Sequence, residues 1–75
     1  MPRLPSLSAN EILSALNKLG YRKVRQRGSH IRLHCEGRKP ITVPSYKLIG
    51  RGLLRKILRD AEISPKEFSE LLRKK

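Results

Sequence analysis

The chain has 75 residues, of which 37% are hydrophobic, and its 18 Lys and Arg against six Asp and Glu give a formal net charge of +12. A chain this short buries only about 60% of the surface that its unfolded form exposes, which excludes a large enclosed substrate pocket. Its hydrophobic content favours a folded domain over a disordered tail, so we expect one domain over residues 1–75, and its charge favours a polyanionic partner.

The basic charge is concentrated in the middle of the chain. No acidic residue lies between Glu11 and Glu36, a span with six Lys and Arg, or between Glu36 and Asp60, a span with seven more. Four of the six acidic residues fall within residues 60–70. This distribution predicts a central surface that binds phosphates and a C-terminal third that faces away from them. The alternative is a basic surface that is merely solvated.

The chain has a single cysteine, Cys35, which excludes an internal disulfide and fits a reducing compartment. Because Cys35 alternates with Ile31 and Leu33, we expect it in the core. The sequence has neither a long apolar run nor a recognisable N-terminal export leader. We therefore expect a cytoplasmic protein with no membrane segment.

The first predicted element is a helix over residues 9–19. Ser8 and Glu11 have the spacing of a capping box, with Leu7 and Ile12 placed as a hydrophobic staple around it. Gly20 suits the C-terminal cap. Apolar residues recur at the i, i+3, i+4, i+7 spacing of one buried helix face: Ala9, Ile12, Leu13, Leu16 and Leu19.

Between residues 21 and 43 the hydrophobic period changes to two, which indicates β-strands. The apolar residues that alternate most clearly with polar ones are Ile31, Leu33 and Cys35. Turn residues interrupt this stretch at Gly28-Ser29 and again at 36–38, before the apolar residues of 41–43. We therefore expect three short antiparallel strands joined by tight turns, the last of them ended by Pro44.

Two helices are predicted after the strands. The first has a buried apolar stripe and, on another face, arginines at steps of four: the stripe is Leu53, Leu54, Ile57, Leu58 and Ala61, and the arginines are Arg51, Arg55 and Arg59. Ser64 and Glu67 repeat the capping pattern around Pro65, which predicts a short helix over about residues 65–73. The order α-β-β-β-α-α predicts an α+β fold in which helices cover one face of a three-stranded antiparallel sheet.

The residue types present exclude several chemistries. Clustered acidic residues for a two-metal nuclease, a Cys–His array for zinc and a Walker-type glycine loop are all missing from the sequence. With only Tyr21, Tyr46 and Phe68, the chain also offers no evident aromatic platform for stacking bases. We therefore expect no metal or organic cofactor, and recognition by charge and shape.

Two histidines, His30 and His34, remain as catalytic candidates. On a strand, four residues separate them by about 13 Å, too far for both to act on one phosphate, so at most one is catalytic. His30 is favoured because it follows the Gly28-Ser29 turn, where a ligand can approach the backbone closely. A passive surface histidine is the alternative, and spacing alone does not decide between the two. His34 is predicted to be structural or to touch phosphate.

Several segments, taken in their order over about residues 8–64, resemble those of a known protein family. They are the opening amphipathic helix with Leu19-Gly20-Tyr21, the triplet Gly28-Ser29-His30, Ile41-Thr42-Val43-Pro44, the run from Gly52 to Leu58, and Ala61-Glu62-Ile63-Ser64. In these segments the chain resembles the HicA-type mRNA interferase toxins of bacterial toxin–antitoxin pairs. The triplet alone is a weak motif, whereas this order in a short basic chain is fairly specific.

The resemblance implies a fold like that of double-stranded-RNA-binding domains, RNA cleavage that depends on the histidine of the triplet, and neutralisation by a HicB-type antitoxin. The catalytic role then falls to His30. Two positions depart from the family pattern. Many relatives have a second histidine just after the Val-Pro pair, where this chain has Ser45, and they often have Gly where it has Glu62. The first departure puts a two-histidine mechanism in doubt.

The sequence thus predicts a metal-independent endoribonuclease acting on mRNA, with His30 as general base or general acid. The RNA contacts are assigned to the turn and to central basic residues, namely Gly28, Ser29, Arg25, Arg27, Arg32, Lys47, Arg51 and Arg55. We expect a monomeric free toxin that forms a hetero-oligomer with a HicB-like antitoxin. Two alternatives remain: a non-catalytic RNA-binding module, and a membrane-surface peptide, which the short capped elements disfavour.

Overall fold

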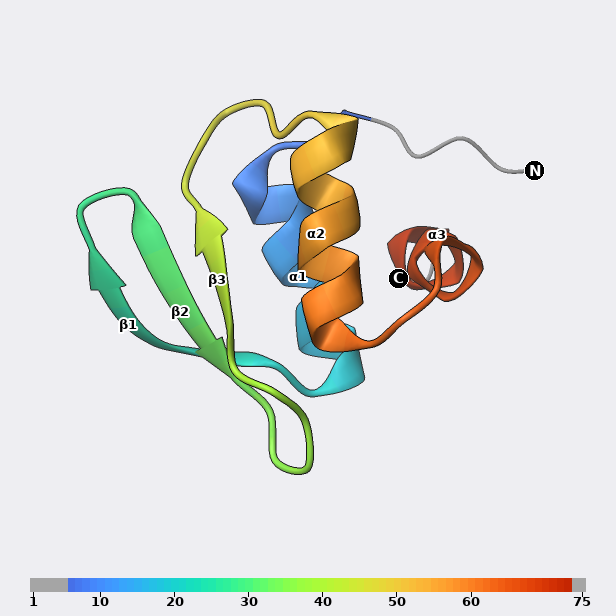
Figure 1. Ribbon diagram of the computed structural model, residues 1–75, viewed down its shortest axis with the longest axis horizontal. Coiled ribbons are helices and arrows are strands. Elements are labelled where there is room, and N and C mark those ends of the chain that lie inside the picture. The colour runs from blue at the N-terminus through green and yellow to red at the C-terminus, as the bar shows by residue number, and fades with distance from the viewer. Residues whose placement is uncertain (1–5, 74–75) are drawn as a thin grey trace.

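The helices and strands follow the predicted order in the computed structural model, which describes residues 6–73 (Figure 1). They are α1 (Ala9–Leu19), β1 (Arg22–Arg27), β2 (His30–His34), β3 (Ile41–Pro44), α2 (Arg51–Ala61) and α3 (Pro65–Arg73). The strands form one antiparallel sheet in the order β1-β2-β3. This is the expected α+β fold of the double-stranded-RNA-binding-domain type, with α3 added. Residues 1–5, where no export leader was expected, and 74–75 lie outside the described part.

Both capping boxes that the sequence predicts are present. At the start of α1, the Glu11 N–H donates to the Ser8 hydroxyl at 3.2 Å and the Ser8 N–H donates to the Glu11 carboxylate at 3.0 Å. At α3 the same exchange joins Ser64 and Glu67, at 3.1 Å in each direction. These bonds satisfy N–H groups that have no partner inside the helix, and so they fix where each helix begins.

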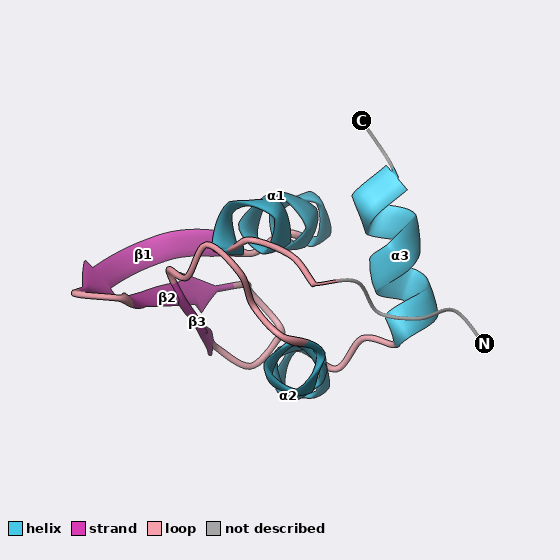
Figure 2. Ribbon diagram, turned by 90° about the horizontal axis from the view of Figure 1, so that it is seen from above, coloured by secondary structure: helices cyan, strands magenta, loops and turns pink. Residues whose placement is uncertain are grey.

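Helices α1 and α2 lie on one side of the sheet, and α3 packs beyond them, chiefly against α1 (Figure 2). The core fills the space between these helices and the strands β2 and β3, and its largest fully buried side chains are Tyr21, Phe68, Ile12, Leu16, Ile41, Ile49, Leu54 and Val43. Cys35 is buried, as expected. None of the described helices is both long and apolar enough to span a membrane.

Strand β1 projects beyond the layer of helices. All of its residues are exposed, and its contacts are with β2 (Figure 1). The predicted helix layer therefore covers β2 and β3, while β1 is an edge strand held by its backbone ladder. The opposite face of the sheet is open and carries the polar side chains of β2.

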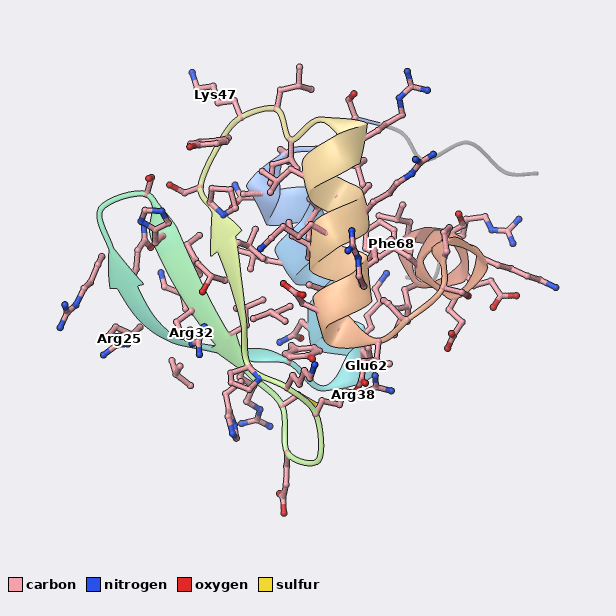
Figure 3. The ribbon with its side chains drawn as sticks, viewed as in Figure 1. Arg25, Arg32, Arg38, Lys47, Glu62 and Phe68 are labelled. Atoms are coloured by element: carbon pink, nitrogen blue, oxygen red, sulfur yellow. The ribbon has the colours of Figure 1, made fainter. Side chains whose placement is uncertain are left out.

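Two hydrogen bonds tie the loop between β2 and β3 to the rest of the fold. Arg38 donates through Nη1 to the carbonyl of Ala61, the last residue of α2, at 3.0 Å, and the Tyr21 hydroxyl donates to the Lys39 carbonyl at 2.8 Å. Glu62 follows with a left-handed backbone, φ 60° and ψ 42°. Figure 3 shows Arg38 and Glu62 together at this end of α2.

Candidate active site

A two-residue turn, Gly28-Ser29, joins β1 to β2 and sets the position of His30, the first residue of β2. Gly28 has φ 55°, in the left-handed region that favours glycine, and Ser29 does not share this positive φ. A two-residue hairpin turn in which the first residue is glycine and only that residue has a positive φ has the pattern of a type II′ turn. A Cβ at Gly28 would meet nothing within 4 Å. Backbone conformation therefore selects glycine here, and the space beside the turn is open to a ligand.

The turn is also tied to the end of β3. The Ser45 N–H donates to the Ser29 carbonyl at 2.6 Å, and the Gln26 side-chain amide donates to the Gly28 carbonyl at 3.0 Å. His30 itself pairs with Pro44 of β3 on one side and with β1 on the other. The backbone that carries the imidazole is thus held from both neighbouring strands.

The His30 side chain lines a hollow of about 150 Å³ on the open face of the sheet, which we call the His30 hollow. The other side chains that line it are Arg25, Arg27, Arg32 and Thr42. Strand pairing explains the grouping, because Arg27 faces His30 across the ladder, and Arg32 pairs with Arg25 on one side and Thr42 on the other. Pockets for drug-sized ligands have volumes of about 300–1,000 Å³. This hollow suits one phosphate group of a larger molecule.

The arginines of the His30 hollow are not neutralised within the described residues. None of Arg25, Arg27 and Arg32 forms an ion pair there. Arg32 donates through Nη1 to the Thr42 hydroxyl at 2.9 Å, which orients its guanidinium on the sheet face. Unpaired guanidinium groups have free donors for phosphate oxygens, with which they form strong charge-assisted hydrogen bonds.

A β-bulge adds an arginine to this face. The register between β1 and β2 shifts by one residue between Lys23 and Arg25, so that Arg22 pairs with His34. An extra residue in one strand reverses the alternation of its side chains from that point on. Arg22 therefore lies on the same face as Arg25, although the two are three residues apart. Strict alternation assigns Arg22 to the opposite face, so the sequence pattern does not predict it as a residue of the site.

His34 lines a different hollow, of about 520 Å³, at the other end of β2. Its other lining residues are Gly20, Arg22, Val24, Cys35 and Glu36. The structure thus places the two histidines in separate hollows of one strand, as the predicted spacing of about 13 Å requires. No single phosphate can contact both.

The remaining predicted contacts, Lys47, Arg51 and Arg55, lie outside the His30 hollow. All three are exposed, the first on the β3–α2 loop and the others on α2, and none forms an ion pair with a described residue. Figure 3 shows Lys47 on the loop, away from Arg25 and Arg32 on the sheet. The predicted set therefore divides into the hollow and an outlying group, which consists of Lys47, Arg51 and Arg55.

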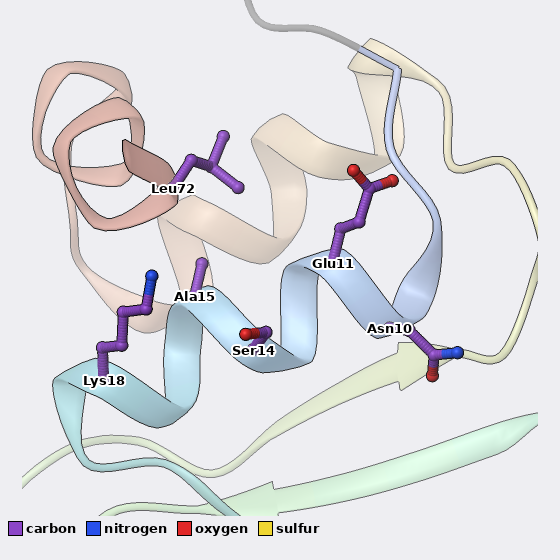
Figure 4. Close-up of a pocket in the computed structure, with 6 residues that line it drawn as sticks. All are labelled: Asn10, Glu11, Ser14, Ala15, Lys18 and Leu72. Carbon is purple, nitrogen blue, oxygen red and sulfur yellow. The ribbon is translucent and has the colours of Figure 1, made fainter. Parts of the chain in front are cut away.

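A further hollow, of about 300 Å³, lies between α1 and α3 (Figure 4). Its charged groups are already engaged, because Glu11 belongs to the capping box and Lys18 donates to the Leu71 carbonyl at 2.8 Å. The Glu11 bonds lie within the start of α1, and the Lys18 bond joins α1 to α3. Among residues 6–73, no three His, Cys, Asp or Glu side chains are grouped so that they could bind a metal ion.

Comparison with known proteins identifies one family. The family model described as the HicA toxin of bacterial toxin–antitoxin systems matches residues 9–63, a span that runs from the first residue of α1 past the end of α2 and contains the whole His30 hollow. No curated protein and no solved structure matches the chain. Since the matched span is most of the sequence, the chain belongs to the HicA toxin family of bacterial toxin–antitoxin systems.

Proposed function

We propose that this toxin is an endoribonuclease that cleaves mRNA at the His30 hollow. The observation that carries the proposal is the position of the exposed His30 imidazole at the start of β2, in a hollow of the size of a phosphate group. The arginines that line the same hollow form no ion pair with a described residue. Phosphodiester transfer needs a group that moves a proton and cations that stabilise charge on the phosphoryl oxygens. The hollow contains both.

In the base-catalysed form of this reaction, an unprotonated ring nitrogen of His30 accepts the proton of a ribose 2′-hydroxyl while that oxygen attacks the adjacent phosphorus. The bond from phosphorus to the 5′-oxygen breaks as the new bond forms. The products are a 2′,3′-cyclic phosphate and a 5′-hydroxyl, whose proton comes from water or from His30. A positioned base or acid contributes about 10²- to 10⁴-fold to the rate. As general acid, a protonated His30 instead gives its proton to the departing 5′-oxygen while water takes the 2′-hydroxyl proton, and the products are the same.

The other residues of the site bind and position the RNA. Arg25, Arg27 and Arg32 donate to the phosphoryl oxygens, where charge develops in the transition state. Gly28 and Ser29 leave the approach to His30 open, since no Cβ stands at the first of them. The outlying group contacts phosphates farther along the strand, which adds affinity without sequence preference.

The toxin–antitoxin pairing implies a protein that restrains the activity. We propose a HicB-like antitoxin that covers the His30 hollow in a hetero-oligomer, with the free toxin a monomer in the cytoplasm. The net charge of +12 favours an acidic partner and a fast encounter with it, while lasting inhibition requires desolvated contacts over the catalytic face.

The direct test is RNA cleavage by the purified protein, compared with its His30→Ala and His34→Ala variants. Each is incubated with a defined RNA in excess chelator, and the fragment ends are mapped. We expect the parent protein to leave 2′,3′-cyclic phosphate ends. His30→Ala should lose at least about 10²-fold in rate while keeping most of its RNA affinity, because affinity comes from many phosphate contacts. His34→Ala is the matched control and should still cleave.

Other outcomes point to other functions. An active His30→Ala variant beside an inactive His34→Ala variant would reverse the assigned roles. A parent protein that binds the RNA and leaves it intact would be the non-catalytic RNA-binding module. Cleavage that stops when chelator is added would contradict metal-independent chemistry.

A further inference from the structure

Among residues 6–73, the exposed large hydrophobic side chains are Val24, Tyr46 and Leu48. Two of them stand together on the six-residue loop between β3 and α2, where Tyr46 is 51% exposed and Leu48 is 67% exposed. Isolated exposed apolar side chains are ordinary in folded proteins, whereas neighbouring ones beside a binding site mark a contact surface.

The backbone of this loop is anchored on both sides of the two exposed side chains. The Ser45 N–H donates to the Ser29 carbonyl at 2.6 Å, and the Tyr46 carbonyl accepts from the N–H of Ala9, the first residue of α1, at 3.0 Å. Beyond Leu48, Ile49 is fully buried and exchanges two backbone hydrogen bonds with Leu7, at 2.6 and 3.4 Å. The loop is therefore preorganised, and the two side chains are exposed because an anchored backbone holds them there.

The backbone of Tyr46 lies close to the end of the sheet that carries His30. Tyr46 follows Pro44 by two residues, which span at most about 7 Å, and Pro44 pairs directly with His30. Its hydroxyl makes no hydrogen bond to any described residue, so no internal bond accounts for its orientation. Lys47, between the two apolar side chains, supplies a cation for the backbone of a bound strand. A nucleotide next to the one at His30 is thus within reach of the ring.

We propose that Tyr46 stacks on an unpaired base beside the cleaved bond, and that the enzyme therefore selects single-stranded RNA. The location of the cleaved bond rests on the proposed ribonuclease function. Aromatic side chains stack on any base whose face is free, and in a duplex those faces are already covered by neighbouring bases. Leu48 packs against the edge of the same nucleotide. The fold resembles domains that bind double-stranded RNA, but an exposed aromatic ring on this loop suits the bases of a single strand.

The size of the exposed patch favours RNA over a protein partner. A stable protein interface buries about 800 Å² on each partner, far more than two side chains provide. One ring, by contrast, is all that stacking on one base requires. The loop itself also carries no opposing charge, since no Asp or Glu occurs between Glu36 and Asp60 in the sequence.

The proposal can be tested without cleavage by working in the His30→Ala background, which leaves the RNA intact. The affinity of Tyr46→Ala, Tyr46→Phe and Val24→Ala is measured for a labelled single-stranded RNA and for the same sequence in a duplex. Val24→Ala is the matched control, because it removes an exposed apolar side chain elsewhere on the sheet. We expect Tyr46→Ala to bind the single strand about 5- to 150-fold more weakly and the duplex unchanged. Tyr46→Phe and Val24→Ala should bind like the parent.

Several results would overturn the proposal. Unchanged binding of the single strand by Tyr46→Ala is one, and an equal loss for single strand and duplex is another. A variant that loses antitoxin affinity while keeping its RNA affinity would make the loop a partner contact. If the parent protein cleaves no RNA and yet Tyr46→Ala selectively loses the single strand, the ribonuclease function fails while the stacking site remains.

Discussion

Glu62 ends α2 in a backbone conformation that is unfavourable for a residue with a Cβ. Its φ of 60° is the sole positive φ outside glycine among the described residues. The left-handed conformation costs an L-residue about 1 to 2 kcal/mol, and helices that end this way usually do so with Gly or Asn. The strain therefore comes from the Cβ of Glu62.

We expect Glu62→Gly to raise the free energy of unfolding by about 1 kcal/mol, because glycine adopts the same φ without strain. Urea denaturation measures the change. Glu62→Ala is the matched control, since it removes the same charge and keeps the Cβ, and it should give no gain. Equal gains in the two variants would assign the effect to the charge.

The ionisation of Tyr21 links the stability of the fold to pH. Its ring is buried and its hydroxyl donates to the Lys39 carbonyl. Burial raises the pKa of this phenol, with Cys35 and Glu62 adding to the effect and Arg38 opposing it. The folded protein therefore holds the proton more tightly than the unfolded chain does. The resulting stabilisation is complete below the ordinary pKa of about 10 and is lost as the pH rises through the folded value.

We expect Tyr21→Phe to lower the free energy of unfolding by about 1 kcal/mol at neutral pH, since the Lys39 carbonyl loses its donor. Above about pH 10 the difference between the two proteins should shrink, because only the parent still has a phenol to ionise. Denaturation curves at a series of pH values measure it, and the titration of lysines cancels in the comparison. A difference that stays constant across this range would contradict the assignment.

Among the elements, β1 differs from the others because none of its residues is buried. Lys23 and Gln26 pair with the buried Leu33 and Ile31 of β2, and so they continue the core side of the sheet with polar side chains. Polar and charged residues on an edge strand oppose pairing with other chains. The same composition leaves β1 with little apolar packing, which predicts low local stability.

Native-state hydrogen exchange tests that inference. The amides of β1 should exchange through openings that need much less free energy than global unfolding, while those of α1, whose inner face is buried, should need nearly all of it. Binding of RNA should slow exchange in β1, because the strand carries arginines of the His30 hollow. Protection in β1 equal to that in α1 would show that the strand is part of the cooperative core.

Local patterns predicted the elements well. The two capping boxes define the starts of α1 and α3, and the alternation of Ile31, Leu33 and Cys35 defines the inner face of β2. Those signals are local, so a single sequence contains them. The bulge in β1 is different, because an extra residue is recognisable only against the partner strand. Arg22 was therefore missed as a residue of the open face.

The residues that line the hollow were also predicted only in part, because some of them come together through strand pairing. The sequence selected His30 through its turn and assigned Arg25, Arg27 and Arg32 as RNA contacts, and the structure places these four side chains in one hollow. Thr42 enters that hollow through strand pairing that no local pattern reveals. The sequence also suggested no stacking platform, because the exposure of Tyr46 depends on hydrogen bonds to residues far away in the chain.

On the scale of the whole molecule, the proposed RNA-binding surface combines the basic residues of the hollow with those of the outlying group. The molecule measures 34 × 27 × 23 Å, so its excess of positive charge is confined to a small volume. Self-repulsion of this kind destabilises the compact state, and binding of RNA relieves it. Affinity should therefore depend strongly on salt.

If each arginine and lysine of the hollow and the outlying group neutralises one phosphate, the logarithm of the binding constant should fall with the logarithm of salt concentration at a slope of about −4 for single-stranded RNA. Lys47→Ala should reduce the steepness by about 0.7. Titrations of the His30→Ala variant at several salt concentrations measure both. A flat dependence would contradict the electrostatic assignment, and a Lys47→Ala slope equal to the parent's would remove that residue from the contact surface.

The hydrogen bond from the Ser45 N–H to the Ser29 carbonyl joins the turn that carries His30 to the loop that carries Tyr46. That bond fixes the backbone of the turn relative to the backbone of the loop, so the two proposed RNA contacts start from a fixed separation. A base held by the ring and the bond broken at the imidazole are then separated by a constant number of nucleotides. If both proposals hold, each cut falls at the same number of nucleotides from the base that stacks on Tyr46.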